Sequence, residues 1–240
     1  MERALEVALE VPPPPAVPEP SFLLRQPLVG EMWCAEHRPV HESTAVLRLP
    51  KLMTDEEIDM ILTARGPPSP PRKHPMLRGT NTGLAAVHDV AESDVHRKLY
   101  LHRGGHFSQE WPALAGKLLQ AMLGQSDYPC SAKPAAGLRI RCAELHTYDV
   151  SGGLMSRGHR DRGSVLTMSV LLSDRSAMDG GEFLTWDAAG AKVVHDMDRG
   201  DAVLFHSEKT HNVATVTRGV RYSLVIELWE GPENTYDRSR

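Results

Sequence analysis

The sequence predicts an α+β domain, mainly β with flanking helices, whose core is a double-stranded β-helix or jelly roll. Two observations carry this prediction. From Leu138 onward the chain reads as short strand-like segments separated by Gly, Asp and Asn turn signals, as in an all-β sandwich or barrel. Ahead of them lie segments with helical spacing of apolar residues, which would cover one outer face of the core. The expected core strands are 138–148, 164–172, 182–186, 191–195, 202–206, 212–216 and 221–229.

Length and composition are those of a single domain. The chain has 240 residues, of which 41% are hydrophobic and 24% charged, which is ordinary for a globular protein. The net charge of −4 provides no basic field that would attract nucleic acid or anionic lipid. No apolar run is long enough to span a bilayer, and the acidic N-terminus is neither a secretory signal nor a typical transit peptide. We therefore expect a cytoplasmic or nuclear protein, with its 3 cysteines reduced.

A proline-rich disordered tail is expected over residues 1–27, and one domain over 28–240. The stretch 11–20 reads VPPPPAVPEP and therefore lacks amide donors and buries little apolar surface. Disorder is favoured here over a polyproline ligand for a partner. Within the domain, a helical layer over 43–137 is expected to precede the jelly-roll core over 138–230.

The helical layer is expected to open with a strand over 44–49. Thr54 is followed three residues later by Glu57, a capping box that predicts a helix through Leu62. A second helix is expected over 92–101. A third should begin at Pro112, because four apolar side chains there form one stripe: Trp111, Leu114, Leu118 and Met122.

The proline-rich segment 66–75 can be neither helix nor central strand. It is interpreted as a surface loop. The functional alternative is a mobile lid over a pocket, since long loops often carry function.

The stretch 158–161 (GHRD), with His211 far downstream, predicts a metal site. Residues i and i+2 of an extended segment point to the same side, so His159 and Asp161 can face one ion together. His211 can complete the site from another strand. Two imidazoles and one carboxylate, with the opposite positions open, form the ligand set of non-haem Fe(II) oxygenases.

Two alternatives compete with this metal site. His206 and Glu208 form another candidate pair, but the only later histidine, His211, is too near to come from a separate strand. Closed structural zinc sites use four ligands, usually thiolates and histidines at short spacings, and no cysteine lies near His159. The ligand types alone do not exclude a catalytic zinc ion that keeps one coordination position open.

Arg221 predicts a site for a carboxylate-bearing co-substrate, because a guanidinium fork matches a carboxylate, and Ser223 follows it two residues later. Strand alternation places both on one side, opposite a set of apolar residues: Tyr222, Leu224, Ile226 and Leu228. That arrangement favours an interior position for Arg221. The same register places Glu227 inside, where the pattern gives it no role.

The segment 144–229 resembles the Fe(II)- and 2-oxoglutarate-dependent dioxygenase superfamily, and within it the prolyl 4-hydroxylase-like branch. The region 43–137 resembles it loosely. The matching stretches are LHTY at 145–148, GHRD at 158–161, DGGEF at 179–183, RGDAVLF at 199–205, HNV at 211–213 and RYSL at 221–224. Each is weak alone, but their order and spacing are specific. One departure lies three residues before the first histidine, where several members of the branch have an aromatic residue and this chain has Ser156.

The resemblance implies an activity and a set of site residues. The activity is hydroxylation of a C–H bond with O2, most simply in a peptidyl proline, with release of succinate and CO2. The cofactor is Fe(II) and the co-substrate 2-oxoglutarate, and the chemistry leaves room for ascorbate. The implied iron ligands are His159, Asp161 and His211. The implied 2-oxoglutarate contacts are Arg221, at the distal carboxylate, with hydroxyl donors Ser223 and Tyr148.

Three side chains are candidates for the substrate side: Arg157, Arg160 and His146. The arginines, with Arg162, crowd the entrance and would suit an acidic peptide or a small anionic substrate; pointing to solvent is the alternative. His146 shares a strand face with Tyr148 and would border the pocket.

The expected partners are O2 and a peptide, protein or small-molecule substrate, with neither nucleic acid nor membrane. A nucleic-acid demethylase is disfavoured because Glu227 stands where that relative has a second arginine. Other classes stay open: a dioxygenase of a small molecule or a non-prolyl side chain, a non-catalytic jelly-roll binding module, and a metal-dependent isomerase or other cupin enzyme without 2-oxoglutarate.

Overall fold

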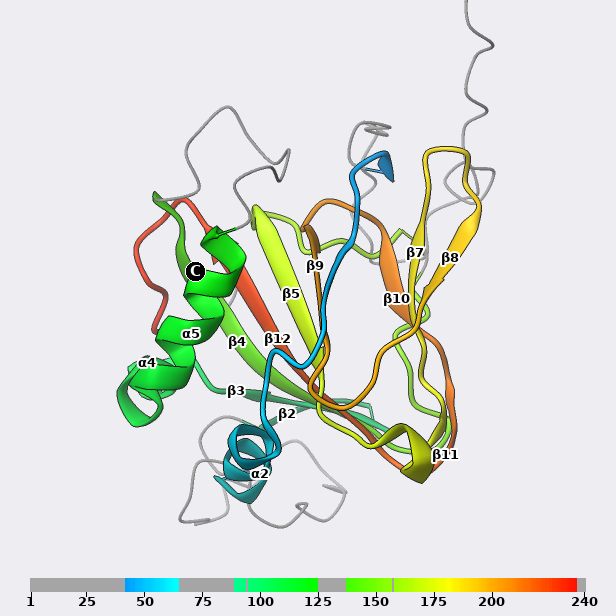
Figure 1. Ribbon diagram of the computed structural model, residues 1–240, viewed down its shortest axis with the longest axis horizontal. Coiled ribbons are helices and arrows are strands. Elements are labelled where there is room, and N and C mark those ends of the chain that lie inside the picture. The colour runs from blue at the N-terminus through cyan, green and yellow to red at the C-terminus, as the bar shows by residue number, and fades with distance from the viewer. Residues whose placement is uncertain (1–41, 65–88, 94, 125–136, 157, 237–240) are drawn as a thin grey trace, which may run out of the picture.

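The computed structural model describes residues 42–64, 89–93, 95–124, 137–156 and 158–236 (Figure 1). The predicted tail at 1–27 and the predicted loop at 66–75 lie outside them. The helices are α2 (Asp55–Ala64), η1 (Arg103–Gly105), α4 (His106–Glu110), α5 (Pro112–Leu123) and η3 (Arg175–Ala177). The strands are β1 (Leu47–Leu49), β2 (Asp89–Ser93), β3 (His96–Tyr100), β4 (Arg139–Tyr148), β5 (Leu166–Leu171), β6 (Asp179–Gly180), β7 (Phe183–Trp186), β8 (Lys192–His195), β9 (Ala202–His206), β10 (His211–Val213), β11 (Val216–Arg218) and β12 (Arg221–Trp229).

The strands form a large sheet and two small ones. The large sheet has 7 strands in the order β1-β9-β5-β12-β4-β3-β2, and the small ones are β10-β7-β8 and β11-β6. Within the described ranges every strand pairing is antiparallel. The β10-β7-β8 sheet stands beside β9 of the large sheet (Figure 1). This arrangement confirms the prediction of a mainly β fold with few helices.

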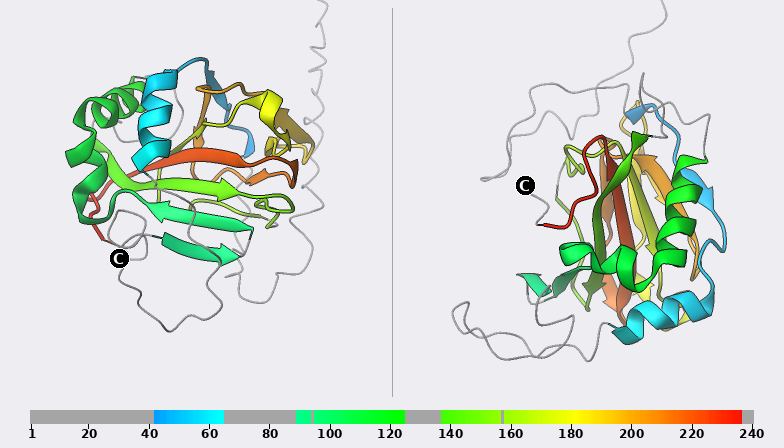
Figure 2. Two further views of the ribbon diagram at one scale, coloured as in Figure 1. Left: turned by 90° about the horizontal axis from the view of Figure 1, so that it is seen from below. Right: turned by 90° about the vertical axis from the view of Figure 1, so that its left-hand side faces the viewer.

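Helices α2, α4 and α5 lie on one side of the large sheet (Figure 2). Alternate residues of β12 explain how the sheet serves two purposes. Leu224, Ile226 and Leu228 join the core cluster that contains the helical residues Ile58 and Leu118. The side chains between them, Ser223, Val225 and Glu227, face the other way, toward the β10-β7-β8 sheet. The predicted helical cover of one outer face is confirmed, and the other face is left to build a site.

The capping box and the helix that it predicts are confirmed. The Glu57 amide donates to Thr54 Oγ1 at 3.3 Å, and the Thr54 amide donates to Glu57 Oε2 at 2.9 Å. Lys117 of α5 reaches the same carboxylate at 2.7 Å, which connects the two helices. The helix from Pro112 is also confirmed, as α5.

The predicted helix over 92–101 is wrong, because β2 and β3 form an antiparallel hairpin there. β3 pairs with β4 from His96 opposite Tyr148 to Tyr100 opposite Glu144. Pairing with a long neighbouring strand outweighs the weak local preference of the segment. The expected strand over 212–216 is divided between β10 and β11. None of the helices in the described part of the chain is long and apolar enough to cross a membrane.

Asp201 joins the start of β9 to the segment after β1, and its removal should weaken the fold. Its carboxylate accepts from Arg48 at 2.6 Å and from the amides of Lys51 and Asp198 at 2.9 and 3.0 Å. Burial alone would raise the pKa of Asp201, but these donors outweigh it and leave the pKa below its ordinary value. We expect Asp201→Asn to lower the free energy of unfolding by about 1–3 kcal/mol at pH 7.

The pH dependence of this loss follows from the lowered pKa. A carboxyl group of this kind stabilises the fold above its unfolded-state pKa, and the contribution is lost as the pH falls through its folded-state pKa. The difference in urea unfolding between Asp201→Asn and the unsubstituted protein should therefore shrink below about pH 4. The exposed Glu110 provides a control, Glu110→Gln, with little effect at either pH. An Asp201→Asn difference that is the same at pH 7 and pH 3 would contradict this account.

Candidate metal centre

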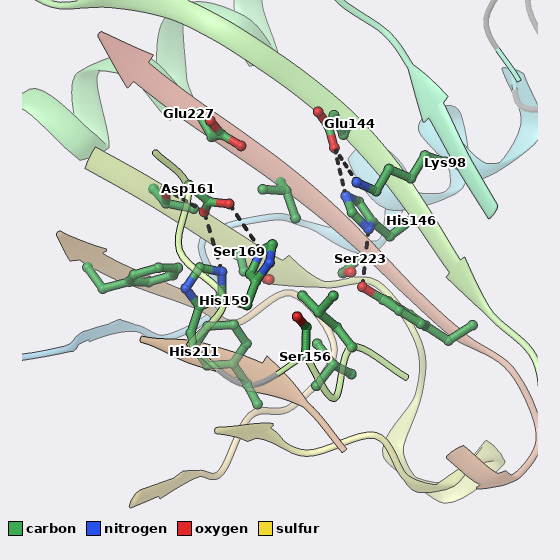
Figure 3. Close-up of a pocket in the computed structure, with 17 residues that line it drawn as sticks. Lys98, Glu144, His146, Ser156, His159, Asp161, Ser169, His211, Ser223 and Glu227 are labelled. Atoms are coloured by element: carbon green, nitrogen blue, oxygen red, sulfur yellow. Dashed lines mark hydrogen bonds and ion pairs between the residues drawn. The ribbon is translucent and has the colours of Figure 1, made fainter. Parts of the chain in front are cut away.

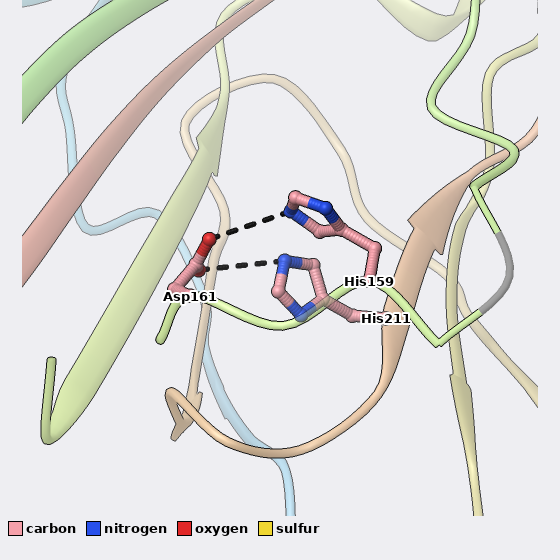
Figure 4. Close-up of side chains that lie close together, drawn as sticks. All are labelled: His159, Asp161 and His211. Carbon is pink, nitrogen blue, oxygen red and sulfur yellow. Dashed lines mark ion pairs between the residues drawn. The ribbon is translucent and has the colours of Figure 1, made fainter. Parts of the chain in front are cut away.

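Three potential metal ligands meet between the sheets (Figure 4). His159 and Asp161 lie on the loop that leads to β5, and His211 begins β10. Asp161 Oδ1 lies 3.4 Å from His159 Nε2, and Asp161 Oδ2 lies 3.4 Å from His211 Nε2. The ligand atoms all lie within 4.8 Å of one another. The structure therefore brings together the three residues that the sequence proposed for a metal ion.

Neighbouring groups orient two of these side chains. The His211 Nδ1–H donates to the carbonyl of Lys209 at 3.0 Å, which leaves the Nε2 lone pair directed toward Asp161. Asp161 Oδ2 accepts from the Thr167 hydroxyl at 2.9 Å. Such supporting bonds fix ring tautomer and carboxylate orientation in metal sites. Nitrogen and carboxylate donors in this arrangement fit a divalent cation such as Fe(II).

Arg160, proposed for the substrate side, points away from the cavity. Its guanidinium donates to Glu42 Oε1 at 3.0 Å and to Thr210 Oγ1 at 3.2 Å. Thr210 also donates its hydroxyl to Glu42 at 2.6 Å. Arg160 therefore links the loop of His159 and Asp161 to the residue before His211 and supports the geometry of the centre. Arg157 lies outside the described residues, and Arg162 is exposed.

A cavity of about 240 Å³ opens beside the three ligands (Figure 3). Two of the predicted residues on its wall, His146 and Tyr148, come from β4, and a third, Ser223, comes from β12. Ser156, at the position where the sequence departs from the branch pattern, also lines it. Its apolar lining comes from Leu154, Phe183, Phe205, Val213 and Val225.

Arg221 lies behind Ser223 rather than on the cavity wall. Its side chain is 1% exposed, and Nη1 donates to Ser223 Oγ at 2.7 Å while Nε donates to the Gly181 carbonyl at 2.8 Å. Burial lowers the pKa of Arg221 to about 10, and among the described residues no carboxylate forms an ion pair with it. A buried guanidinium that is bonded only to neutral groups fits an anionic ligand.

Gly181 is the position where a small change should disturb Arg221. Its φ is +68°, and an added Cβ would lie 2.9 Å from both Arg221 Cδ and Met178 Cε. We expect Gly181→Ala to lower the free energy of unfolding by about 1–3 kcal/mol and to displace the guanidinium. Isothermal titration of 2-oxoglutarate, the co-substrate that the resemblance implies, should then give an affinity about tenfold weaker than that of the unsubstituted protein.

Gly116 in α5 provides the matched control, because an added Cβ there meets nothing within 4 Å. Gly116→Ala should raise the free energy of unfolding by about 0.5–1 kcal/mol and leave ligand binding unchanged. Equal affinity of the two alanine variants for 2-oxoglutarate would show that Gly181 has no role in placing Arg221.

The sequence did not identify the charged part of the cavity wall. Lys98, Glu144 and Glu227 line it, and each of the three side chains is less than 10% exposed. Figure 3 shows Lys98 and Glu144 with His146, across the cavity from the metal ligands. Strand alternation was the available signal: it places Glu144 on the face of His146 and Tyr148, and Glu227 on the face of Ser223. Lys98 could not be identified because its strand was expected to be a helix.

Two other sets of potential metal ligands fit an ion less well. Cys142, Glu144 and Glu227 have donor atoms within 4.8 Å of one another. Basic side chains already stand beside the two carboxylates: Lys98 Nζ is 3.8 Å from Glu144, and Arg141 is 3.7 Å from Glu227. The competing pair His206 and Glu208 forms no group with a third ligand in the described ranges, and His206 Nδ1 accepts the Glu208 amide at 3.1 Å.

Comparison with known sequences finds relatives over part of the chain. A PKHD-type hydroxylase of Methylobacterium nodulans is 31% identical over 121 residues, which are 45% of this chain and 51% of that protein. The PKHD-type hydroxylase YbiX of Escherichia coli is 37% identical over 86 residues, 35% of this chain and 37% of YbiX. The matched part is thus about half of these relatives or less. No family model matches the chain.

Comparison with solved structures confirms the jelly-roll fold. A 2OG-Fe(II) oxygenase family protein of Burkholderia pseudomallei aligns with a TM-score of 0.53 at 14% identity, covering 84% of this chain and 95% of that one. The viral collagen prolyl hydroxylase of Paramecium Bursaria Chlorella virus-1 aligns at 0.51 and 13%, covering 80% and 99%. HygX of Streptomyces hygroscopicus, solved with nickel and 2-oxoglutarate, aligns at 0.54 and 12%, covering 79% and 84%. Together with the hydroxylase relatives, these structures confirm the resemblance to the superfamily and its prolyl 4-hydroxylase-like branch.

Proposed function

We propose that this chain is an Fe(II)- and 2-oxoglutarate-dependent dioxygenase that hydroxylates a C–H bond. One observation carries the proposal: His159, Asp161 and His211 converge beside a cavity that is backed by the buried Arg221. The distance in sequence between the two ligand segments makes chance convergence a poor explanation. The partial similarity to PKHD-type hydroxylases supports the same reaction class.

Each residue has a distinct part in this chemistry. His159, Asp161 and His211 would hold Fe(II), which when bound supplies activation of O2. Arg221 and Ser223 would bind the distal carboxylate of 2-oxoglutarate, and Tyr148 would donate a further hydrogen bond. The apolar side chains of Phe183, Phe205 and Val213 would exclude water from the reacting groups. The expected products besides the hydroxylated substrate are succinate and CO2.

A prolyl residue of a peptide or protein is the first substrate to test, because the branch resemblance suggests it. A second candidate, a small molecule or a non-prolyl side chain, is favoured by the buried charges of Lys98, Glu144 and Glu227 on the cavity wall. A prolyl ring offers these groups no hydrogen bond, whereas an amine or hydroxyl group can donate to the two carboxylates and a hydroxyl can accept from Lys98. Mass spectrometry of prolyl peptides and of amine- or hydroxyl-bearing compounds should find which class gains one oxygen atom.

The reaction class is tested without knowing the substrate. Under argon, Fe(II) and 2-oxoglutarate added together should give a weak visible charge-transfer band. The band should be absent from His159→Ala. In air, the unsubstituted protein should release succinate in a manner that requires both Fe(II) and 2-oxoglutarate, and ascorbate should sustain the yield. Succinate release that needs neither would reject the proposal.

A further inference from the structure

The hairpin β2–β3, which the sequence missed, places a histidine beside the proposed co-substrate contact. His96 of β3 stands opposite Tyr148 of β4, and His146 precedes Tyr148 by two residues on the same face. All three side chains are buried, with exposures of 5%, 2% and 6% for His96, Tyr148 and His146. The rings of His96 and Tyr148 stack with centroids 4.2 Å apart.

Glu144 fixes the tautomer of His146. Its Oε2 lies 3.0 Å from His146 Nε2, and Lys98 Nζ at 3.8 Å favours the ionised carboxylate (Figure 3). An ionised carboxylate only accepts hydrogen bonds, so Nε2 must carry the hydrogen. Burial lowers the pKa of His146 to about 4, against the opposing effect of Glu144, so the ring is neutral at pH 7. Nδ1 of His146 is therefore a lone-pair acceptor.

Two donors compete for this one acceptor. The Tyr148 hydroxyl lies 3.1 Å from His146 Nδ1, and so does His96 Nε2. If the tyrosine donates to His146, its single hydrogen is no longer available to a ligand in the cavity. If His96 donates, the tyrosine hydrogen can turn toward the cavity, where Ser223 and the Arg221 behind it provide the neighbouring donors.

We propose that His96 and His146 are positioning residues for the co-substrate: the Nε2–H of His96 occupies His146 Nδ1 and so leaves the Tyr148 hydrogen for a carboxylate of 2-oxoglutarate. This inference rests on the proposed function, because it concerns the same co-substrate. It adds two residues that orient the Tyr148 hydroxyl without being among the proposed contacts of iron or 2-oxoglutarate. The chain Glu144–His146–His96 determines the direction in which a hydroxyl two residues along β4 donates.

A binding experiment without turnover tests the inference. We would titrate 2-oxoglutarate calorimetrically, under argon, into protein loaded with Mn(II). His96→Phe keeps a ring against Tyr148 but removes the N–H, so Tyr148 should donate to His146 and the Kd for 2-oxoglutarate should rise about tenfold. Adding His146→Leu removes the competing acceptor, and the double variant should recover to within about threefold of the original Kd. In a Tyr148→Phe background, His96→Phe should have no further effect.

The control variant is His106→Phe, since His106 lies in α4 and does not line the cavity. Its Kd should match that of the unsubstituted protein. Three results would each overturn the inference. The affinity of His96→Phe for 2-oxoglutarate could be unchanged, or the double variant with His146→Leu could fail to recover. The third is that His96→Phe weakens binding equally in the Tyr148→Phe background. If the unsubstituted protein fails to bind 2-oxoglutarate, the proposed function itself falls, so the two failures are distinguishable.

A second measurement needs no variant and no metal. Nitrogen-15 NMR of histidine-labelled protein should report hydrogen on Nε2 and none on Nδ1 of His146, with hydrogen on Nε2 of His96. A hydrogen on His146 Nδ1 would overturn the inference, because that atom could not then accept from either donor.

Discussion

Replacing Asp161 with alanine is expected to abolish tight metal binding and, with it, succinate release. Asp161 is the only charged member of the three and lies 3.4 Å from a nitrogen of each histidine. Losing a side chain that merely supports a ligand costs about 10- to 100-fold in metal affinity, so losing the anionic ligand should cost more than about 100-fold. After loading with Fe(II) or Mn(II), elemental mass spectrometry should find about one equivalent of metal in the unsubstituted protein and almost none in Asp161→Ala.

The matched control for this prediction is His206→Ala. His206 is nearly as buried as Asp161, belongs to the competing candidate pair, and makes a local bond to the Glu208 amide. It should bind metal as the unsubstituted protein does. Retention of metal by Asp161→Ala, or equal loss from both variants, would show that the ion is held elsewhere.

Replacing Arg221 with alanine should remove 2-oxoglutarate binding while leaving metal binding intact. The guanidinium is 1% exposed and its bonds within the described residues are to Ser223 and the Gly181 carbonyl. Truncating one member of a buried, hydrogen-bonded charge pair costs about 2–5 kcal/mol, which corresponds to roughly 30- to 4000-fold in affinity. The Kd for 2-oxoglutarate, measured by calorimetry with Mn(II), should rise within that range.

This variant also separates the classes of function that the sequence left open. An isomerase or another cupin enzyme that uses no 2-oxoglutarate should keep its activity in Arg221→Ala, and a binding module should show no succinate release in any variant. Arg221→Lys is an informative companion, since it keeps the charge and loses the planar fork. It should bind 2-oxoglutarate more tightly than Arg221→Ala and more weakly than the unsubstituted protein. Identical affinities in all three proteins would contradict a co-substrate role.

The sequence predicted well the features that depend on residues close together in the chain, such as the alternation of polar and apolar side chains along a strand. The period of two along 221–229 separates Arg221 and Ser223 from Leu224 and Ile226, and the structure places the two sets on opposite faces of β12. The capping box at Thr54 is equally local, because donor and acceptor are three residues apart.

Features that depend on distant partners were missed. The sequence suggested that Arg160 is available to a substrate. Its partner in the structure, Glu42, is 118 residues away, and no local pattern joins the two. The segment of β3 has helical spacing, and only its pairing with β4 makes it a strand. The same pairing brings His96 and Lys98 to the cavity side, so an error in one element concealed part of the site.

The most direct test of the central claim is a crystal structure with Fe(II) or Mn(II), recorded at the absorption edge of the metal. We expect one strong anomalous peak, bonded to Nε2 of His159, a carboxylate oxygen of Asp161 and Nε2 of His211 at about 2.0–2.3 Å. A peak between Cys142, Glu144 and Glu227, or no peak between the two histidines at full metal loading, would contradict it.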